Sequence, residues 1–144
     1  MLKNKLTLYF FLLTITNFHS ANAHHELADK NIVSGQENYQ LHCASCHGVD
    51  LEGQPNWRKL KADGSLPAPP HDETGHTWHH SDEDLFFITK YGGAGKAGGA
   101  SAMPGYEQIL SDKEIISVLS FIKSTWPVQI RLQQDQINEQ TVKK

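Results

Sequence analysis

The hydrophobic positions of this chain follow a helical period most clearly near its C-terminal end. A stripe of apolar residues recurs there at helical spacing: Ile115, Ile116, Val118, Leu119 and Ile122. Ser111 and Glu114 have the spacing of a capping box, in which each residue bonds to the backbone of the other. Pro127 cannot continue a helix. The pattern predicts a helix between Ser111 and Pro127, with its stripe packed in the core.

A second helix is predicted shortly before this one. Ser81 is a suitable N-cap, and the three acidic residues 82–84 favour the positive end of the helix dipole. The apolar residues 85–88 follow, and Gly92 ends the pattern. We expect this helix to supply a second wall of the core.

The third predicted helix covers residues 31–46, with Ser34 as its candidate N-cap and Gly48 at its end. Residues 48–80 are rich in glycine and proline and show no period, so they predict a long loop. A loop of this length is unusual in a small domain. It is expected here only if it wraps a large ligand.

The first residues have the pattern of a secretory signal peptide. Lys3 and Lys5 precede a mostly apolar stretch over residues 6–15, and residues 21–23 read Ala-Asn-Ala, a typical cleavage site. The apolar stretch is too short to span a bilayer, and no cysteine lies near the cleavage site to carry a lipid. We therefore expect residues 1–23 to be removed and the mature protein to lie in the periplasm, without a transmembrane anchor.

The rest of the chain is expected to form one domain with two polar ends. Residues 24–30 predict a disordered N-terminus, and residues 31–127 are long enough for one domain with a single core. Residues 128–144 are rich in glutamine with weak apolar spacing, so they predict a frayed polar tail.

The net charge of the chain limits the kinds of partner that we expect it to bind. The chain has 16 acidic and 13 basic side chains and a formal net charge of −3, which becomes more negative once Lys3 and Lys5 are removed. Nucleic acids and anionic membranes attract basic patches, so neither is expected as a partner. A protein that docks through a basic patch fits this charge.

The strongest candidate chemistry lies in Cys43-Ala44-Ser45-Cys46-His47. Thiols at this spacing lie about one helical turn apart, so both can form thioethers with the vinyl groups of one haem. The histidine that follows can bind the iron. A thioredoxin-like disulfide and a zinc site are the alternatives. No buried strand precedes the motif, and these are the only two cysteines, so haem is the favoured reading.

Met103 is the candidate for a second ligand to the iron. It ends a glycine-rich segment, residues 92–105, in which small residues let the backbone pass close to a flat ligand. The segment also matches the nucleotide-binding pattern of glycines, but no strand-helix-strand unit surrounds it. Met103 is the only methionine left after cleavage. A thioether ligand raises the reduction potential. Packing in the core, or a rival histidine from residues 71–80, are the alternatives.

Residues 71–80 form a histidine-rich loop, His-Asp-Glu-Thr-Gly-His-Thr-Trp-His-His. Trp78 and a histidine could bond to a haem propionate and exclude water. His76 with His79 or His80 could instead hold copper or zinc, which suit imidazole and carboxylate ligands. Solvated surface histidines without a specific role are the third possibility.

Together these motifs resemble a class I c-type cytochrome. The haem motif follows a helix that carries Gly35 and Tyr39, and Met-Pro-Gly precedes a capped helix that ends in Trp-Pro. The resemblance covers about residues 31–127 and is greatest to single-haem domains that also occur as subunits of haem–copper oxidases. It implies an all-α fold of three main helices, the first and last crossing nearly at right angles, around one covalently attached haem c and its iron, with long wrapping loops.

The resemblance also implies the roles of individual residues. Cys43 and Cys46 are the thioether sites, and His47 and Met103 are the axial ligands. A loop proline carbonyl often accepts the proximal imidazole N–H in this family, and Pro55 is the nearest candidate.

The expected function is electron transfer, not catalysis. An exported carrier of one electron needs no catalytic base, and two filled axial positions leave no site for oxygen or peroxide. Redox proteins are the expected partners, and association with a membrane oxidase of a respiratory chain is a further expectation. A peroxidase-like enzyme, in which Met103 is displaced, and a copper- or zinc-handling module built on residues 71–80 are the alternatives.

Overall fold

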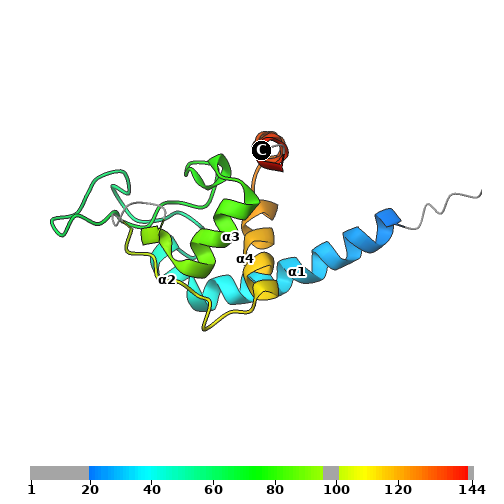
Figure 1. Cartoon of the computed structure of the whole chain (residues 1–144), viewed down its shortest axis with the longest axis horizontal. Helices are drawn as coiled ribbons and strands as arrows, with labels where there is room; N and C mark the ends of the chain where they lie inside the picture. The colour runs from blue at the N-terminus through cyan, green and yellow to red at the C-terminus, as the bar shows by residue number, and fades with distance from the viewer. Residues whose placement is uncertain (1–19, 96–100, 143–144) are drawn as a thin grey trace, which may run out of the picture.

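The computed structural model describes residues 20–95 and 101–142 of the chain (Figure 1). Its α-helices are α1 (Ser20–His42), α2 (Ala44–His47), α3 (Asp82–Tyr91), α4 (Asp112–Ser124) and α5 (Val128–Val142). The 3-10 turns η1 (Thr77–His79) and η2 (Gly93–Gly95) lie between them. Within these residues there is no strand, only a bridge between Leu66 and Ser101. The predicted all-α class is therefore confirmed.

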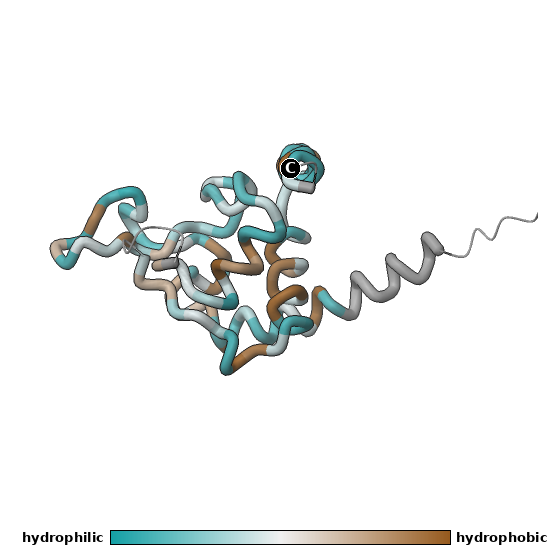
Figure 2. The backbone as a smooth tube through the Cα atoms, in the orientation of Figure 1, coloured by the Kyte–Doolittle hydropathy of each residue, from teal (hydrophilic) through white to brown (hydrophobic). Residues whose placement is uncertain are grey.

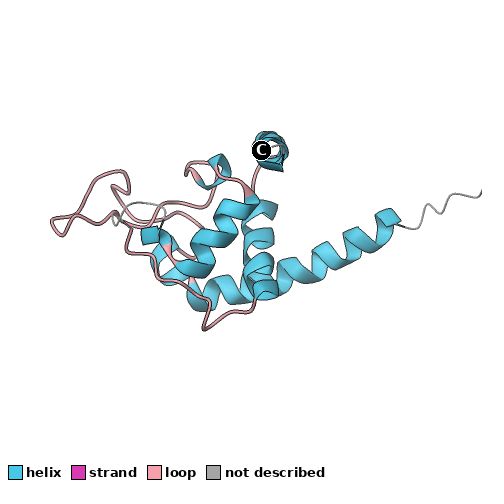
Figure 3. Cartoon of the chain, in the orientation of Figure 1, coloured by secondary structure: helices cyan, strands magenta, loops and turns pink. Residues whose placement is uncertain are grey.

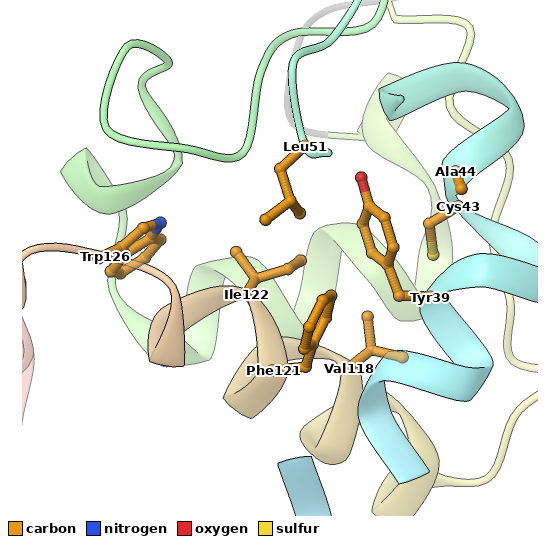
Figure 4. Close-up of a cluster of buried hydrophobic side chains, with 8 residues drawn as sticks. All are labelled: Tyr39, Cys43, Ala44, Leu51, Val118, Phe121, Ile122 and Trp126. Atoms are coloured by element: carbon orange, nitrogen blue, oxygen red, sulfur yellow. The ribbon is translucent and has the colours of Figure 1, made fainter. Parts of the chain in front are cut away.

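The core forms where α1 crosses α4. A Cβ atom on Gly35 of α1 would lie 1.9 Å from the Ser117 carbonyl oxygen and 3.0 Å from Phe121 Cβ in α4. Only glycine lets the two helices approach this closely. Tyr39, which is fully buried, then packs against Phe121 with ring centroids 5.4 Å apart (Figure 4).

The capped start of α4 is confirmed in detail. Ser111 Oγ accepts from the Glu114 N–H, and Glu114 Oε2 accepts from the Ser111 N–H at 2.8 Å. The predicted apolar stripe is only partly correct, because Ile116 is 49% exposed while Ser117 is buried. Ser117 faces Gly35 at the close crossing, where a large side chain would not fit. Figure 2 shows α4 as the most continuously hydrophobic of the helices labelled in Figure 1.

Helix α3 begins and ends as predicted. Ser81 Oγ accepts from the Asp84 N–H at 3.2 Å, and Gly92 follows the helix with a φ of 91°. The long loop between α2 and α3 is also present, interrupted only by η1 (Figure 3).

Two predictions about α1 are wrong. Ser34 is not an N-cap, because the helix already begins at Ser20 and Ser34 lies inside it. The helix also includes residues 24–30. The single helix predicted over 31–46 is divided at Cys43 into α1 and α2. Residues 1–19 of the predicted signal peptide lie outside the described residues.

The prediction of a frayed tail is also wrong, since residues 128–142 form α5. Gln134 is fully buried, and its Nε2 donates to Asp82 Oδ1 at 2.6 Å and to the His80 carbonyl at 3.3 Å. Asn138 Oδ1 accepts from the Asp82 N–H at 2.7 Å. Ile130 packs against the hydrophobic core, but these other contacts of α5 are polar, so hydrophobic periodicity gave little sign of them. Among the described helices none is both long enough and apolar enough to cross a membrane.

Candidate functional site

Helix α2 is a single turn that carries Cys46 and His47, and Cys43 is its N-cap residue. The N–H groups of Cys46 and His47 both donate to the Cys43 carbonyl, at 3.1 and 2.9 Å. Both thiols are free, Cys43 buried and Cys46 exposed. Burial, followed by repulsion from Cys46, raises the pKa of Cys43 to about 11. A thiol with so high a pKa is a poor thiolate nucleophile, which disfavours the thioredoxin-like alternative.

The imidazole of His47 is held in one orientation beneath this turn. Its ring is 7% exposed, and its Nδ1–H donates to the Pro69 carbonyl at 2.9 Å. Burial lowers the pKa of His47, and the bond to Pro69 opposes that effect. With the proton on Nδ1, the Nε2 lone pair is free to bind a metal.

The carbonyl that fixes His47 belongs to Pro69, so the prediction of Pro55 is wrong. Pro55 is exposed, whereas the chain after the motif folds back and brings residues 69–71 beside Leu51. The His71 N–H donates to the Leu51 carbonyl at 2.7 Å. A Cβ on Gly53 would lie 2.4 Å from the backbone nitrogen of Pro70, so glycine allows this close approach. Proximity in sequence was a poor guide because the loop reverses direction.

The face of the His47 ring is covered by a second histidine. The rings of His47 and His71 stack, with centroids 4.0 Å apart and planes 19° apart. Burial, and then the neighbouring His47, hold the pKa of His71 well below its usual value. Both imidazoles are therefore neutral near pH 7.

Met103 lies in a segment held mainly by the backbone. Its carbonyl accepts from the Gly93 N–H at 3.1 Å, and its N–H donates to Ser101 Oγ at 3.2 Å. A Cβ on Gly92 would lie 3.0 Å from the Gly105 nitrogen and 3.1 Å from the Met103 oxygen. Gly92 therefore lets the backbone after α3 approach the backbone around Met103 closely. Residues 96–100 of the same segment lie outside the described part.

Tyr106 connects the segment around Met103 to the end of α1, next to the cysteine motif. Its N–H donates to the Lys90 carbonyl at 3.0 Å, at the end of α3. Its hydroxyl donates to the His42 carbonyl at 2.7 Å, directly before Cys43. Sequence analysis missed this tyrosine, because nothing local marks a contact between residues 64 positions apart.

Of the other histidines in residues 71–80, His76 and His80 are in contact, with ring centroids 5.4 Å apart and planes 67° apart, while the rest make separate contacts. His76 stacks on Trp57 with centroids 5.1 Å apart, and His79 stacks on Trp78 at 3.7 Å. His71 Nδ1 lies 2.8 Å from Thr77 Oγ1. Across the described ranges, no group of three or more His, Cys, Asp or Glu side chains is placed to hold a metal ion. The copper or zinc alternative therefore finds no support here.

Two buried nitrogens of residues 71–80 bear on whether a haem fits the site. His76 Nδ1 and Trp78 Nε1 are buried and have no hydrogen-bond partner. Buried polar groups are normally paired, so a ligand with acceptor groups is expected here. Haem propionates are such acceptors. The remaining donor set also fits, with two free thiols, a neutral imidazole and a thioether.

Comparison with known proteins gives one match. A family model described as Cytochrome c matches residues 32–126. No curated protein and no solved structure matches the chain.

Proposed function

Because the chain belongs to the cytochrome c family, we propose that it is an exported one-electron carrier whose haem iron is bound by His47 and Met103. Membership of the family means that the chain carries covalently attached haem c with its iron, in an all-α fold of class I type. When bound, this group supplies an iron that accepts and releases one electron. Redox proteins are accordingly its partners.

The observation that carries the ligand assignment is the bond from His47 Nδ1 to Pro69. It places the proton on the nitrogen that faces away from a metal, in a buried ring directly after the two free thiols. A backbone carbonyl in this position orients a ligand imidazole and raises its basicity. Cys43 and Cys46 then hold the haem edge, and His47 binds from the same turn.

Met103 is proposed as the second ligand because its segment is held close to the same turn. Tyr106, three residues later, bonds to the carbonyl directly before Cys43. A neutral, soft thioether favours ferrous iron and raises the potential of the carrier. If His47 and Met103 both held the iron, they would leave it no open position for oxygen or peroxide.

Location and partners are proposed from the sequence. The signal-peptide pattern of residues 1–23 supports export to the periplasm. The excess of acidic side chains supports docking to a partner with a basic patch. The resemblance to haem subunits of haem–copper oxidases supports a place beside such an oxidase.

An absorption spectrum of the purified mature protein tests the proposal. We expect a c-type haem that survives denaturing extraction in the wild type and is lost in Cys43→Ala/Cys46→Ala. We also expect a low-spin ferric spectrum with a sulfur-to-iron charge-transfer band. High-spin ferric iron at rest, together with rapid peroxide turnover, would instead support a peroxidase-like enzyme.

A further inference from the structure

His71 makes the closest ring contact with the proposed proximal ligand. The two imidazoles lie nearly parallel, 19° apart, with 4.0 Å between their centroids. His71 stands only two residues after Pro69, whose carbonyl accepts from the edge of the same ligand ring. Pro70 lies between them and restricts the backbone. The acceptor carbonyl of Pro69 and the ring of His71 that stacks on His47 therefore belong to one stiff segment.

The position of His71 is itself determined by three hydrogen bonds to separate parts of the fold. Its N–H donates to the Leu51 carbonyl at 2.7 Å, and its carbonyl accepts from Trp126 Nε1 at 2.7 Å. Thr77 Oγ1 donates to the Pro70 carbonyl at 3.4 Å, so the Nδ1–H of His71 donates to Thr77 Oγ1, at 2.8 Å.

His71 is itself partly exposed, but the residues that it contacts are among the most buried of the fold. Trp126 is 3% exposed, Thr77 is 5% exposed and Tyr39 is fully buried. The Tyr39 ring meets the His71 ring edge-on, at 6.3 Å and 70°. Close-packed surroundings of this kind hold a side chain in a single rotamer.

Two contacts of different kinds are needed to fix the plane of a ligand ring. A single N–H···O bond tolerates a broad range of angles, so by itself it lets the imidazole turn about its metal bond. A flat ring packed against its face blocks that rotation in both directions. His47 has both contacts, from Pro69 at its edge and from His71 at its face.

We propose that His71 is a positioning residue that sets the plane of the His47 imidazole, and with it the orientation of the proximal ligand on the iron. The proposal rests on the proposed function, since it requires His47 to bind haem iron. Its consequence is electronic, because the plane of an axial imidazole determines how unpaired spin is distributed over a ferric low-spin haem. Proton NMR reads this distribution as the pattern of the haem methyl shifts.

The experiment compares ferric holoprotein spectra of the mature chain and four variants. His71→Leu removes the flat ring, His71→Phe keeps a flat ring, and Thr77→Val removes the side-chain hydrogen bond of His71. The matched control is His79→Leu, which changes an exposed histidine of the same loop. Circular dichroism and the denaturation midpoint of each variant are recorded alongside.

We expect the methyl shifts of His71→Leu to change in order and to span a narrower range, as the His47 ring averages over several orientations. His71→Phe should restore a pattern close to that of the wild type, and Thr77→Val should move the shifts in the same direction as His71→Leu but less. His79→Leu should leave them unchanged. A purely structural role would lower the denaturation midpoint without altering the shifts.

An unchanged methyl pattern in His71→Leu overturns the proposal, as does an equal change in His71→Leu and His71→Phe. If His71→Leu yields no holoprotein, the proposal is tested with Thr77→Val instead. Unchanged methyl shifts in Thr77→Val then overturn the proposal. Failure of the proposed function looks different. In that case the wild type itself would lack low-spin iron or the upfield resonances of a bound methionine.

Discussion

The segments that contain His47 and Met103 are held by different means. His47 is buried, bonds through its side chain to Pro69 and stacks on His71. Met103 is only partly buried, and its segment is held by backbone hydrogen bonds and by the close approach of Gly92 and Gly105 to their neighbours. The His47 ring is therefore held by contacts of its own side chain, whereas the Met103 segment is held mainly through its backbone, at a distance that Gly92 and Gly105 permit. Removing side-chain atoms should damage the contacts of His47, and adding a Cβ at Gly105 should displace the Met103 segment.

The largest expected effect is that of His47→Ala. It removes the proposed ligand, the bond to Pro69 and the stacking on His71 together, so we expect almost complete loss of the low-spin spectrum. Absorption of the purified protein measures it. His79→Ala, at an exposed position, is the control and should keep the spectrum. A low-spin spectrum in His47→Ala would mean that another residue binds the iron on that side.

Met103→Ala should destabilise the fold less than His47→Ala does, and its main effect should be on the absorption band and the reduction potential of the haem. The haem stays attached through both cysteines, while the sulfur-to-iron band disappears and the reduction potential falls. The loss of stability should be smaller than the roughly 2–5 kcal/mol typical of a buried methionine. Ile109→Ala, a 60% exposed position in the same loop, is the control. A retained band would remove Met103 from its proposed role.

Gly105→Ala tests the claim that an added Cβ displaces the Met103 segment. Its Cβ would lie 2.9 Å from the Lys90 carbonyl oxygen, so the segment must shift, at a cost of about 1–3 kcal/mol. The sulfur-to-iron band should then be lost at a lower denaturant concentration than the helical signal. In Gly64→Ala the new Cβ meets nothing within 4 Å but is strained by the φ of 80°, so this control should lower the overall stability while the band and the helical signal are lost together. Equal behaviour of the two variants would contradict the contrast between the two segments.

The smallest expected effect is that of Tyr106→Phe, which cuts the one hydroxyl bond joining the Met103 segment to the carbonyl of His42. A bond of this kind contributes about 1 kcal/mol, and we expect a loss of that order in the free energy of unfolding. Chemical denaturation measures it. Tyr91→Phe, at a 49% exposed ring, should change it little. A loss as large as that of Gly105→Ala would mean that Tyr106 holds more of the segment than its hydrogen bonds indicate.

Features that depend on neighbours a few residues away were predicted well. The caps formed by Ser81 and Ser111 are present, because each involves a bond across three residues. The turn that holds Cys43, Cys46 and His47 is likewise local. The prediction of Ser34 as an N-cap was wrong because it assumed that the helix starts where its apolar pattern starts.

Predictions failed where the packing was polar or the chain turned back. Helix α5 packs through Ile130 onto the core and through Gln134 and Asn138 onto Asp82, and a search for apolar periodicity cannot find the polar contacts. Ile116 is exposed because α4 presents Ser117 to Gly35 at the crossing with α1. The sequence of a helix does not show which residues of another element pack against each of its faces.

The amino-acid sequence by itself determined the candidate chemistry of the site, with two thiols and an imidazole in one turn and the thioether of Met103. Only the tertiary structure decided that Pro69, not Pro55, orients His47, and that His71 covers the ring. The contacts of Pro69, Trp126 and Tyr106 span 22, 55 and 64 residues along the chain. Loops of such lengths can close in many ways at similar entropic cost, so the packing of α1, α3 and α4 selects among them.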